Sequence, residues 1–293
     1  MGSVDGKVVF ITGGAAGVGA EVARRLHARG ARLVLTDVDA EALDRFAATL
    51  GGDRVLTVAA DVRDLAAMQA AAARAVERFG GVDAVVANAG IASYGSVLQV
   101  DPLAFKRLLE INVLGVFHTV RATLPSIIER RGYVLVVSSL AAFTAAPGLA
   151  PYNASKAAVE QFANALRLEV AHHGVDVGSA HMSWVDTAMV RDTKTDLTTF
   201  AEMLSKLPYP LNVTTSVEKC GAAFVTGIEK RKTRVYCPGW VGVLGWVKPI
   251  FSTRLGEAPI RRVVPDLLPR MDAEVVALGR STSAQSERTR GSS

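Results

Sequence analysis

Short runs of Val, Leu and Ile recur along most of the chain, and each is followed by a longer stretch with helical spacing. The first run is KVVFIT, and the next stretch places Val18, Val22 and Leu26 four residues apart before Gly30. Strands that are buried on both faces read as near-continuous apolar runs. The pattern therefore predicts a doubly wound α/β fold, with helices on both faces of a parallel sheet. The expected strands are residues 7–12, 32–36, 54–60, 82–90, 133–139, 175–182 and 234–237.

The pattern changes after the sixth expected strand. Residues 193–213 are polar and then interrupted by Pro208 and Pro210, which predicts a mobile flap. A helix is expected from about 215 to 230, before the last strand.

Three parts of the chain follow from these patterns. We predict a single catalytic domain over residues 1–238, an apolar and basic C-terminal extension over 239–280, and a disordered tail over 281–293. Segment 239–251 is apolar but contains Gly and Pro, and it is shorter than the ~20 residues that a transmembrane helix needs.

Charge is unevenly distributed over the 293 residues. The net charge is +5, and residues 229–293 hold 12 Lys and Arg against 6 Asp and Glu. These basic residues lie among Val, Leu, Trp and Pro and form no nucleic-acid-binding motif, so we expect no nucleic acid partner. A membrane surface or a partner protein suits the mixture better.

Composition excludes several other classes. Hydrophobic residues make up 49% of the chain, enough for a large core, and only two cysteines are present, too few for a disulfide framework. The five histidines have no metal-ligand spacing, so no metal site is expected. No signal-peptide pattern opens the sequence, which predicts a cytoplasmic protein.

A glycine-rich segment, TGGAAGVG (12–19), lies between the first strand and the first helix. It contains Gly13, Gly17 and Gly19, which permit a tight turn and leave the backbone open to a pyrophosphate. The N–H groups at the start of the helix would face the phosphates. Three glycines alone also fit a purely structural turn, but their position after a strand and before a helix favours a dinucleotide.

Asp37 ends the second strand, where an acidic residue can accept hydrogen bonds from the adenosine ribose and repel a 2′-phosphate. No Arg or Lys follows it in TDVDA, which favours NAD over NADP. The alternative role of helix N-cap fits Asp39 better.

Residues 138–162 contain a candidate proton-transfer pair. Tyr152 and Lys156 are four residues apart at the start of a helical pattern, so both project from one face. A nearby ammonium and an oxidised nicotinamide would lower the pKa of the tyrosine from about 10. Ser139, at the end of a strand, would hold the substrate oxygen. An ordinary helix-surface pair would not also supply this serine.

These motifs resemble the short-chain dehydrogenase/reductase family from Gly6 to about Thr187, with weaker similarity to Gly239. The family has a Rossmann-like fold, forms homodimers or homotetramers through paired helices, and acts on CH–OH groups. The resemblance implies that Asn112, Ser139, Tyr152 and Lys156 are catalytic, with the Asn112 backbone holding a relay water and Lys156 also binding the nicotinamide ribose. It implies a cofactor site made of Gly13, Gly17, Val18, Gly19, Asp37, Asp61, Val62, Asn88, Ala89, Gly90, Tyr152, Lys156, Val185 and Thr187.

Two positions depart from the family pattern. Ala87 replaces the first Asn of the NNAG motif, which alters little. Met182 and Ser183 stand where Pro-Gly usually follows the sixth strand, so the backbone beside the nicotinamide and the position of the flap are less predictable.

Mostly apolar candidates surround the motifs, which favours a lipophilic substrate. Core packing would explain each of them equally well. The predicted substrate-pocket residues are Tyr94, Phe143, Trp184 and Met189.

Three functions remain open. We favour an NAD-dependent dehydrogenase of a secondary alcohol; the alternatives are an NADPH-dependent 3-oxoacyl-type reductase and a catalytically silent NAD-binding protein. Residues 239–270 mix Trp and Phe with Arg, which predicts either peripheral membrane contact or packing over the substrate cleft or another subunit.

Overall fold

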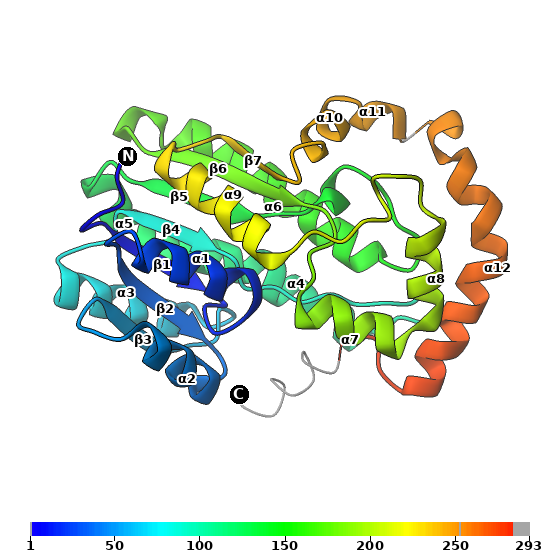
Figure 1. The fold of residues 1–293 in the computed structure, drawn as a ribbon, viewed down its shortest axis with the longest axis horizontal. Coiled ribbons are helices and arrows are strands. Elements are labelled where there is room, and N and C mark those ends of the chain that lie inside the picture. The colour runs from blue at the N-terminus through cyan, green and yellow to red at the C-terminus, as the bar shows by residue number, and fades with distance from the viewer. Residues whose placement is uncertain (1, 252, 284–293) are drawn as a thin grey trace.

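The computed structural model describes residues 2–251 and 253–283 and contains one parallel sheet (Figure 1). Its seven strands lie in the order β3-β2-β1-β4-β5-β6-β7. The predicted doubly wound, Rossmann-like α/β class is therefore confirmed. The strands are β1 (Val8–Thr12), β2 (Arg32–Asp37), β3 (Val55–Ala59), β4 (Ala84–Ala87), β5 (Tyr133–Val137), β6 (Asp176–Met182) and β7 (Arg234–Cys237).

Helices cover both faces of the sheet. On one face lie α1 (Gly17–His27), α2 (Ala40–Leu50) and α9 (Val217–Glu229). The other face is covered by α3 (Leu65–Phe79), α5 (Gly115–Glu129) and α6 (Ala150–Glu169). Short 3₁₀ turns span Leu140–Ala142 and Ala171–His173.

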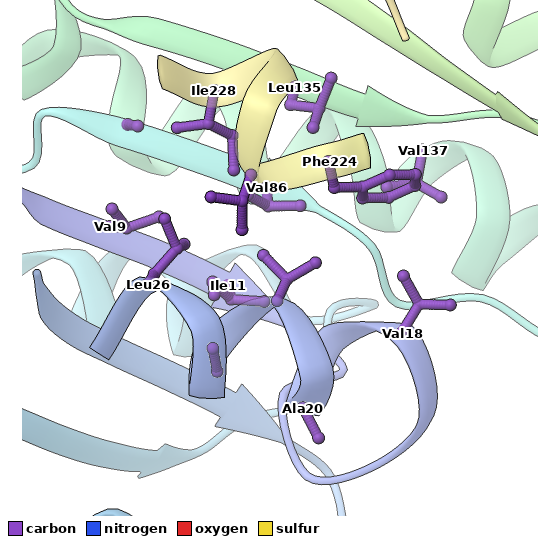
Figure 2. Packing of buried hydrophobic residues seen from close by; sticks show 14 of the residues in the cluster. Val9, Ile11, Val18, Ala20, Leu26, Val86, Leu135, Val137, Phe224 and Ile228 are labelled. Carbon is purple, nitrogen blue, oxygen red and sulfur yellow. The ribbon is translucent and has the colours of Figure 1, made fainter. Parts of the chain in front are cut away.

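Alternation within each strand divides the core into two layers. Val9 and Ile11 of β1 point towards α1 and α9, where Figure 2 shows them beside Leu26 and Ile228. Val8 and Phe10 point to the opposite layer. Burying each such side chain contributes about 1.5–3 kcal/mol, which is why the apolar runs form the central strands.

A long helical stretch leads into the core. It consists of α4 (Pro102–Leu109), a π-helical turn (Glu110–Leu114) and α5. By length and composition alone, Pro102–Glu129 could cross a membrane. This is weak evidence, because core helices meet the same criteria, and Val116 and Val120 are buried against the sheet.

Much of the region expected to be a mobile flap, residues 193–213, is helical. It contains α7 (Ala188–Asp196) and α8 (Thr198–Lys206), joined through Leu197. The Thr187 hydroxyl accepts a hydrogen bond from Val190 N–H and caps α7. This local cap starts a helix that the polar composition did not indicate.

The C-terminal extension begins after β7 and is also helical. It comprises α10 (Val241–Trp246), α11 (Lys248–Phe251) and α12 (Arg254–Leu278). Figure 1 shows α12 alongside α8, at the end of the molecule opposite α2 and α3.

The first residues of the predicted disordered tail are ordered. Ser281, Thr282 and Ser283 are buried, and Thr282 forms a β-bridge with Ser93. The prediction was wrong for these three residues because their backbone pairs with the segment after β4. Residues 284–293 lie outside the described residues.

Candidate active site

A cavity of about 350 Å³ lies along the carboxyl ends of the strands. This edge is where ligands bind in doubly wound sheets, because the loops and helix N-termini converge there. Most of the residues that the sequence singled out line this cavity. They are Gly13, Gly17, Val18, Asp37, Asp61, Val62, Asn88, Ala89, Gly90, Tyr94, Ser139, Tyr152, Lys156, Trp184, Val185, Thr187 and Met189.

The glycine loop uses backbone conformations that other residues avoid. Gly13 and Gly17 have φ angles of 64° and 57°. Gly19 does not line the cavity and acts through close packing, because a Cβ there would lie 2.2 Å from the Gly13 carbonyl oxygen and 2.7 Å from Asn88 Nδ2. The loop therefore has room for a ligand and none for a side chain at position 19.

The N-terminus of α1 opens into the same cavity. Ala16 precedes the helix and provides no side-chain cap, so its first N–H groups have no such acceptor, while Gly17 and Val18 line the cavity. Uncapped N–H groups at the positive end of a helix dipole fit a pyrophosphate.

Asn88 fixes the loop to the end of β4. Its side-chain amide donates to the carbonyl oxygens of Thr12 (2.9 Å) and Gly13 (3.2 Å), and its own N–H donates to Thr12 Oγ1 (3.0 Å). The glycine loop is thereby held in position across the sheet.

Asp37 lies at the far end of the cavity. Its carboxylate accepts hydrogen bonds from the backbone N–H groups of Ala15 (3.1 Å) and Asp39 (3.2 Å). Burial raises the pKa of Asp37, and these hydrogen bonds lower it by less. Asp39 caps α2 by accepting from Ala42 N–H, as the sequence predicted.

Ser139, Tyr152 and Lys156 meet at the other end. The Tyr152 side chain is hydrogen-bonded to Ser139. Lys156 Nζ lies 5.5 Å from the centre of the Tyr152 ring and donates to the Val137 carbonyl oxygen (3.1 Å). The end of β5 and the first turns of α6 thus bring a hydroxyl pair and an ammonium together.

Burial moves the pKa values of the tyrosine and the lysine in opposite directions. It raises the pKa of Tyr152, which the hydrogen bond with Ser139 only partly offsets, and it lowers the pKa of Lys156 to about 8. Each charged form has lost water. A phenolate at Tyr152 therefore depends on a positive charge beside it.

Asn112 does not line the cavity but lies directly behind it, in the π-helical turn. Its Oδ1 accepts from Ile91 N–H (2.8 Å), and its Nδ2 donates to Ile91 O (2.9 Å) and Ser155 Oγ (3.1 Å). A Cβ at Gly90 would lie 3.2 Å from Asn112 Oδ1 and 3.5 Å from Lys156 Nζ, so only a glycine separates the two side chains. The Asn112 side chain therefore links the segment after β4 to α6.

Most of the chain is similar to a known protein family. The short chain dehydrogenase family model matches residues 7–198. The chain belongs to the short-chain dehydrogenase family. It is an oxidoreductase of this family.

This short-chain dehydrogenase is similar to oxidoreductases from several bacteria. A putative oxidoreductase SadH from Mycobacterium tuberculosis is 36% identical over 245 residues, covering 80% of this chain and 87% of the relative. A (-)-trans-carveol dehydrogenase from Rhodococcus erythropolis is 35% identical over 212 residues, covering 67% and 76%. A short-chain dehydrogenase/reductase from Burkholderia phymatum in complex with NAD superposes with a TM-score of 0.72 at 26% identity, covering 84% of this chain and 94% of that one.

Phe143 is not part of the substrate pocket of this short-chain dehydrogenase. It packs against Leu140 and Val241, and its ring stacks on His181 with 4.4 Å between ring centroids. The prediction was wrong because the 3₁₀ turn after Ser139 directs this side chain towards α10 rather than into the cavity.

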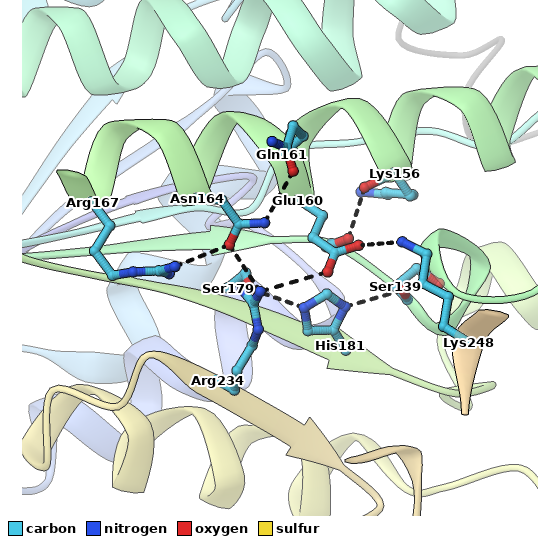
Figure 3. A network of polar contacts seen from close by, with 11 residues as sticks. Ser139, Lys156, Glu160, Gln161, Asn164, Arg167, Ser179, His181, Arg234 and Lys248 are labelled. Atoms are coloured by element: carbon cyan, nitrogen blue, oxygen red, sulfur yellow. Dashed lines mark hydrogen bonds and ion pairs between the residues drawn. The ribbon is translucent and has the colours of Figure 1, made fainter. Parts of the chain in front are cut away.

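His181 belongs to a buried polar network behind Ser139 (Figure 3). Arg234 donates to Ser179 Oγ, so the Ser179 hydroxyl proton is directed to His181 Nε2 (2.9 Å). His181 Nδ1 then donates to the Ser139 carbonyl oxygen (3.3 Å). Burial lowers the pKa of His181 to about 3, so the ring is neutral and serves as a fixed hydrogen-bond bridge.

The substrate end is lined by aromatic and aliphatic groups. Trp184 and Tyr94 each contact Phe200 edge-on, with ring centroids 5.3 and 5.8 Å apart. The Tyr94 hydroxyl is hydrogen-bonded to Thr193, so the segment after β4 is linked to α7. Met182 and Ser183, which replace the usual Pro-Gly, also line the cavity, and Ser183 N–H donates to Cys237 O (2.9 Å).

Sequence reasoning missed several cavity residues. Leu149 lies three residues before Tyr152 and could have been inferred from the start of α6, whereas Phe200 of α8 and Arg107 of α4 carried no spacing signal. Arg63 follows the Asp61-Val62 motif and donates to Asp61 Oδ2 (2.8 Å). Within residues 2–251 and 253–283, no group of three or more His, Cys, Asp or Glu side chains is placed to hold a metal ion.

Proposed function

We propose that this short-chain dehydrogenase uses NAD to interconvert a secondary alcohol and a ketone on a small lipophilic substrate. The observation that carries the proposal is that Ser139, Tyr152 and Lys156 share one cavity with the open N-terminus of α1. A relative named for (-)-trans-carveol and a similar structure in complex with NAD support the same chemistry.

The residues present fit a dinucleotide. The Gly13–Val18 backbone would hold the pyrophosphate, Asp37 the adenosine ribose, and Asp61 with Val62 the adenine. Lys156 would hold the nicotinamide ribose, and Val185 and Thr187 the carboxamide. The cofactor supplies the hydride acceptor in oxidation and the hydride donor in reduction.

Charge at the ribose end supports NAD over NADP. The half-buried Asp37 carboxylate lines the cavity and would repel a 2′-phosphate. Arg63, one of the basic residues in the cavity wall, is engaged by the Asp61 carboxylate at 2.5 Å. A 2′-phosphate would have to displace that ion pair.

Proton transfer falls to the chain's own residues. Tyr152 as phenolate takes the hydroxyl proton of the alcohol, and Ser139 donates a hydrogen bond to the substrate oxygen. Lys156 stabilises the phenolate by its nearby ammonium. Asn112 holds the loop beside Lys156, and its backbone anchors the relay water that the family resemblance implies. In reduction Tyr152 gives the proton to the forming alcohol.

The pocket wall supports an apolar substrate. The Tyr94 hydroxyl is hydrogen-bonded to Thr193, so Tyr94 presents mainly its aromatic ring to the cavity. Trp184, Met189 and Phe200 also line this wall. Such a site binds hydrocarbon by burial and presents the Ser139–Tyr152 pair to the reacting oxygen. A panel of lipophilic secondary alcohols and sugar alcohols tests this; turnover of the sugars alone would contradict it.

Cofactor preference is measured by fluorescence titration of the purified protein with NADH and with NADPH. We expect tighter binding of NADH. Tighter binding of NADPH would contradict the role of Asp37 and favour an NADPH-dependent 3-oxoacyl-type reductase.

The Tyr152→Phe variant tests the proton-transfer role. Turnover should fall at least about 100-fold, because the group that exchanges the proton is lost, while NADH binding is retained. Tyr209→Phe is the matched control, since Tyr209 is exposed on the surface. Full turnover by Tyr152→Phe would refute the mechanism, and a wild-type protein that binds NADH without turning over any alcohol or ketone would favour a silent NAD-binding protein.

We also propose a homodimer or homotetramer through α5 and α6. Leu114, Phe117 and Leu168 are exposed on or beside these helices, and an apolar surface of this kind favours association. Light scattering of the wild type and of Leu168→Asp tests it; an unchanged mass in the variant would argue against this interface. The cytoplasmic location stays a prediction, which cell fractionation can test.

A further inference from the structure

A group of large apolar side chains lies exposed on the C-terminal extension. Trp246 and Leu255 are each 86% exposed, and Val243 and Ile250 are also exposed. We call these four residues the extension patch. An exposed tryptophan and three exposed aliphatic residues within thirteen positions mark an interaction surface.

The patch is the outer side of a segment whose inner side is packed. Val241 of α10 is fully buried against Leu140 and Phe143, so α10 is fixed to the loop that carries Ser139. At the other end of the extension, Leu267 and Met271 of α12 are buried. The extension patch is therefore presented by a segment that is anchored at both ends.

Two of the exposed residues share one face of α10. Val243 and Trp246 are three positions apart, the spacing of one helical face. Ile250 is exposed on the next helix, α11. Leu255 follows in the first turn of α12. Figure 1 places these helices at the end of the molecule opposite α2 and α3.

Positive charge surrounds the patch. Residues 243–262 contain four basic residues and one acidic residue, Glu257, which Arg261 already engages at 2.7 Å. Lys248 is paired with Glu160. Arg254 and Arg262 are exposed and have no ion-pair partner among residues 2–251 and 253–283. Two unpaired guanidinium groups are thus available to an outside anion.

We propose that the extension patch with Arg254 and Arg262 docks this protein on an anionic lipid surface. Apolar side chains would enter the headgroup boundary, with tryptophan at the interface, and the arginines would contact lipid phosphates. This inference goes beyond the proposed function and does not depend on the cofactor or the reaction.

A second copy of the chain is the competing occupant. A two-fold dimer brings the same surface against itself. Here that would place the unpaired Arg254 and Arg262 of both copies close together, where like charges repel. An anionic lipid surface complements the same charges, so the observations favour lipid.

The test is co-sedimentation of the full chain with vesicles, at low and physiological salt. One vesicle set is phosphatidylcholine alone, and the other contains 30% phosphatidylserine, on the order of a strongly anionic leaflet. We expect the protein to pellet with the anionic set and less so as salt rises. Absence of pelleting, or equal pelleting with both sets, would overturn the proposal.

Two variants localise the contact. Trp246→Ser with Leu255→Glu should abolish pelleting, and Arg254→Gln with Arg262→Gln should weaken binding about fivefold per arginine and reduce its salt dependence. Leu98→Glu is the matched control, because Leu98 is equally exposed but lies in the loop before α4. Far-UV circular dichroism and thermal unfolding verify that each variant is folded.

The competing outcome is distinguishable. If Trp246→Ser with Leu255→Glu leaves vesicle binding unchanged, or turns a dimer into a monomer in light scattering while the wild type ignores vesicles, lipid docking is wrong. A failure of the proposed NAD chemistry would leave the vesicle result unaffected.

Discussion

The two ends of the cavity are built in different ways. The cofactor end consists of the glycine loop, the start of α1 and Asp37, all within 25 residues of one another. The substrate end brings together Tyr94, Leu149, Trp184 and Phe200, which are spread over more than a hundred residues. Backbone geometry determines the shape of the cofactor end, and packed side chains determine the shape of the substrate end.

The last helix of the C-terminal extension, α12, supports the substrate end. Met271 and Val275 of α12 pack in the same cluster as Tyr94 and Phe200. Glu274 accepts hydrogen bonds from Thr198 and Thr199 at the start of α8, and Arg280 pairs with Asp196 of α7 at 2.6 Å. We infer that changes in the extension alter substrate binding and spare the cofactor, whereas changes in the glycine loop act on the cofactor directly.

The largest expected effect is at the cofactor end. Gly19→Ala places a Cβ 2.2 Å from the Gly13 carbonyl oxygen, so the loop must shift. We expect NADH affinity to fall at least ~100-fold, a loss of about 2.7 kcal/mol, measured by fluorescence titration. Gly239→Ala is the control, because no atom lies within 4 Å of its added Cβ. Normal NADH binding by Gly19→Ala would show that the loop is less rigid than its packing indicates.

The next effect is at Lys156, in the proton-transfer set. Its pKa is lowered to about 8 in the folded chain, against 10.5 for the unfolded group. Between these values the unfolded chain holds a proton that the folded chain has lost, so stability rises with pH. Relative to Lys156→Met, the wild type should gain about 2 kcal/mol in unfolding free energy from pH 7.5 to 9.5.

Urea unfolding of both proteins at the two pH values measures this difference. The other titrating groups are common to both chains and cancel. A constant difference between wild type and variant would mean that Lys156 keeps an ordinary pKa.

The smallest effect is expected at the substrate end. Arg280→Ala removes the ion pair with Asp196, half-buried on both sides, and loosens α7. KM for a lipophilic alcohol should rise about fivefold, roughly 1 kcal/mol, with NADH affinity unchanged. Arg45→Ala is the control, since its ion pair with Glu41 is exposed on α2. A matched loss of NADH affinity in Arg280→Ala would break the distinction between the two ends.

Sequence patterns predicted the fold because strand and helix periodicity act locally. Runs such as VVFIT must be buried on both sides, and only a covered parallel sheet buries so many of them. The glycine loop and the Tyr152–Lys156 spacing were readable for the same reason. A turn or a helix face determines which of these residues lie together.

Local sequence patterns did not predict that the C-terminal extension is helical. Pro259, Pro265 and Pro269 lie inside α12, and proline disfavours a helix interior by removing an N–H donor. Packing of Leu267, Met271 and Val275 against the body outweighs that cost. The prediction that Phe143 lines the substrate pocket was wrong for a related reason. The direction of its side chain depends on contacts with His181 and Val241, which are far away in the sequence.

The sequence by itself determined the sheet, the glycine loop and the Ser139, Tyr152 and Lys156 set, because each depends on neighbours within a few turns or on burial of a whole run. Only the tertiary structure decided how the substrate end closes, which residues α12 supports and that the Ser139 carbonyl is held by His181. Those features depend on side-chain contacts between segments separated by 40 to 180 residues, such as His181 with Ser139 and Asp101 with Ser281. Local sequence patterns do not predict such contacts.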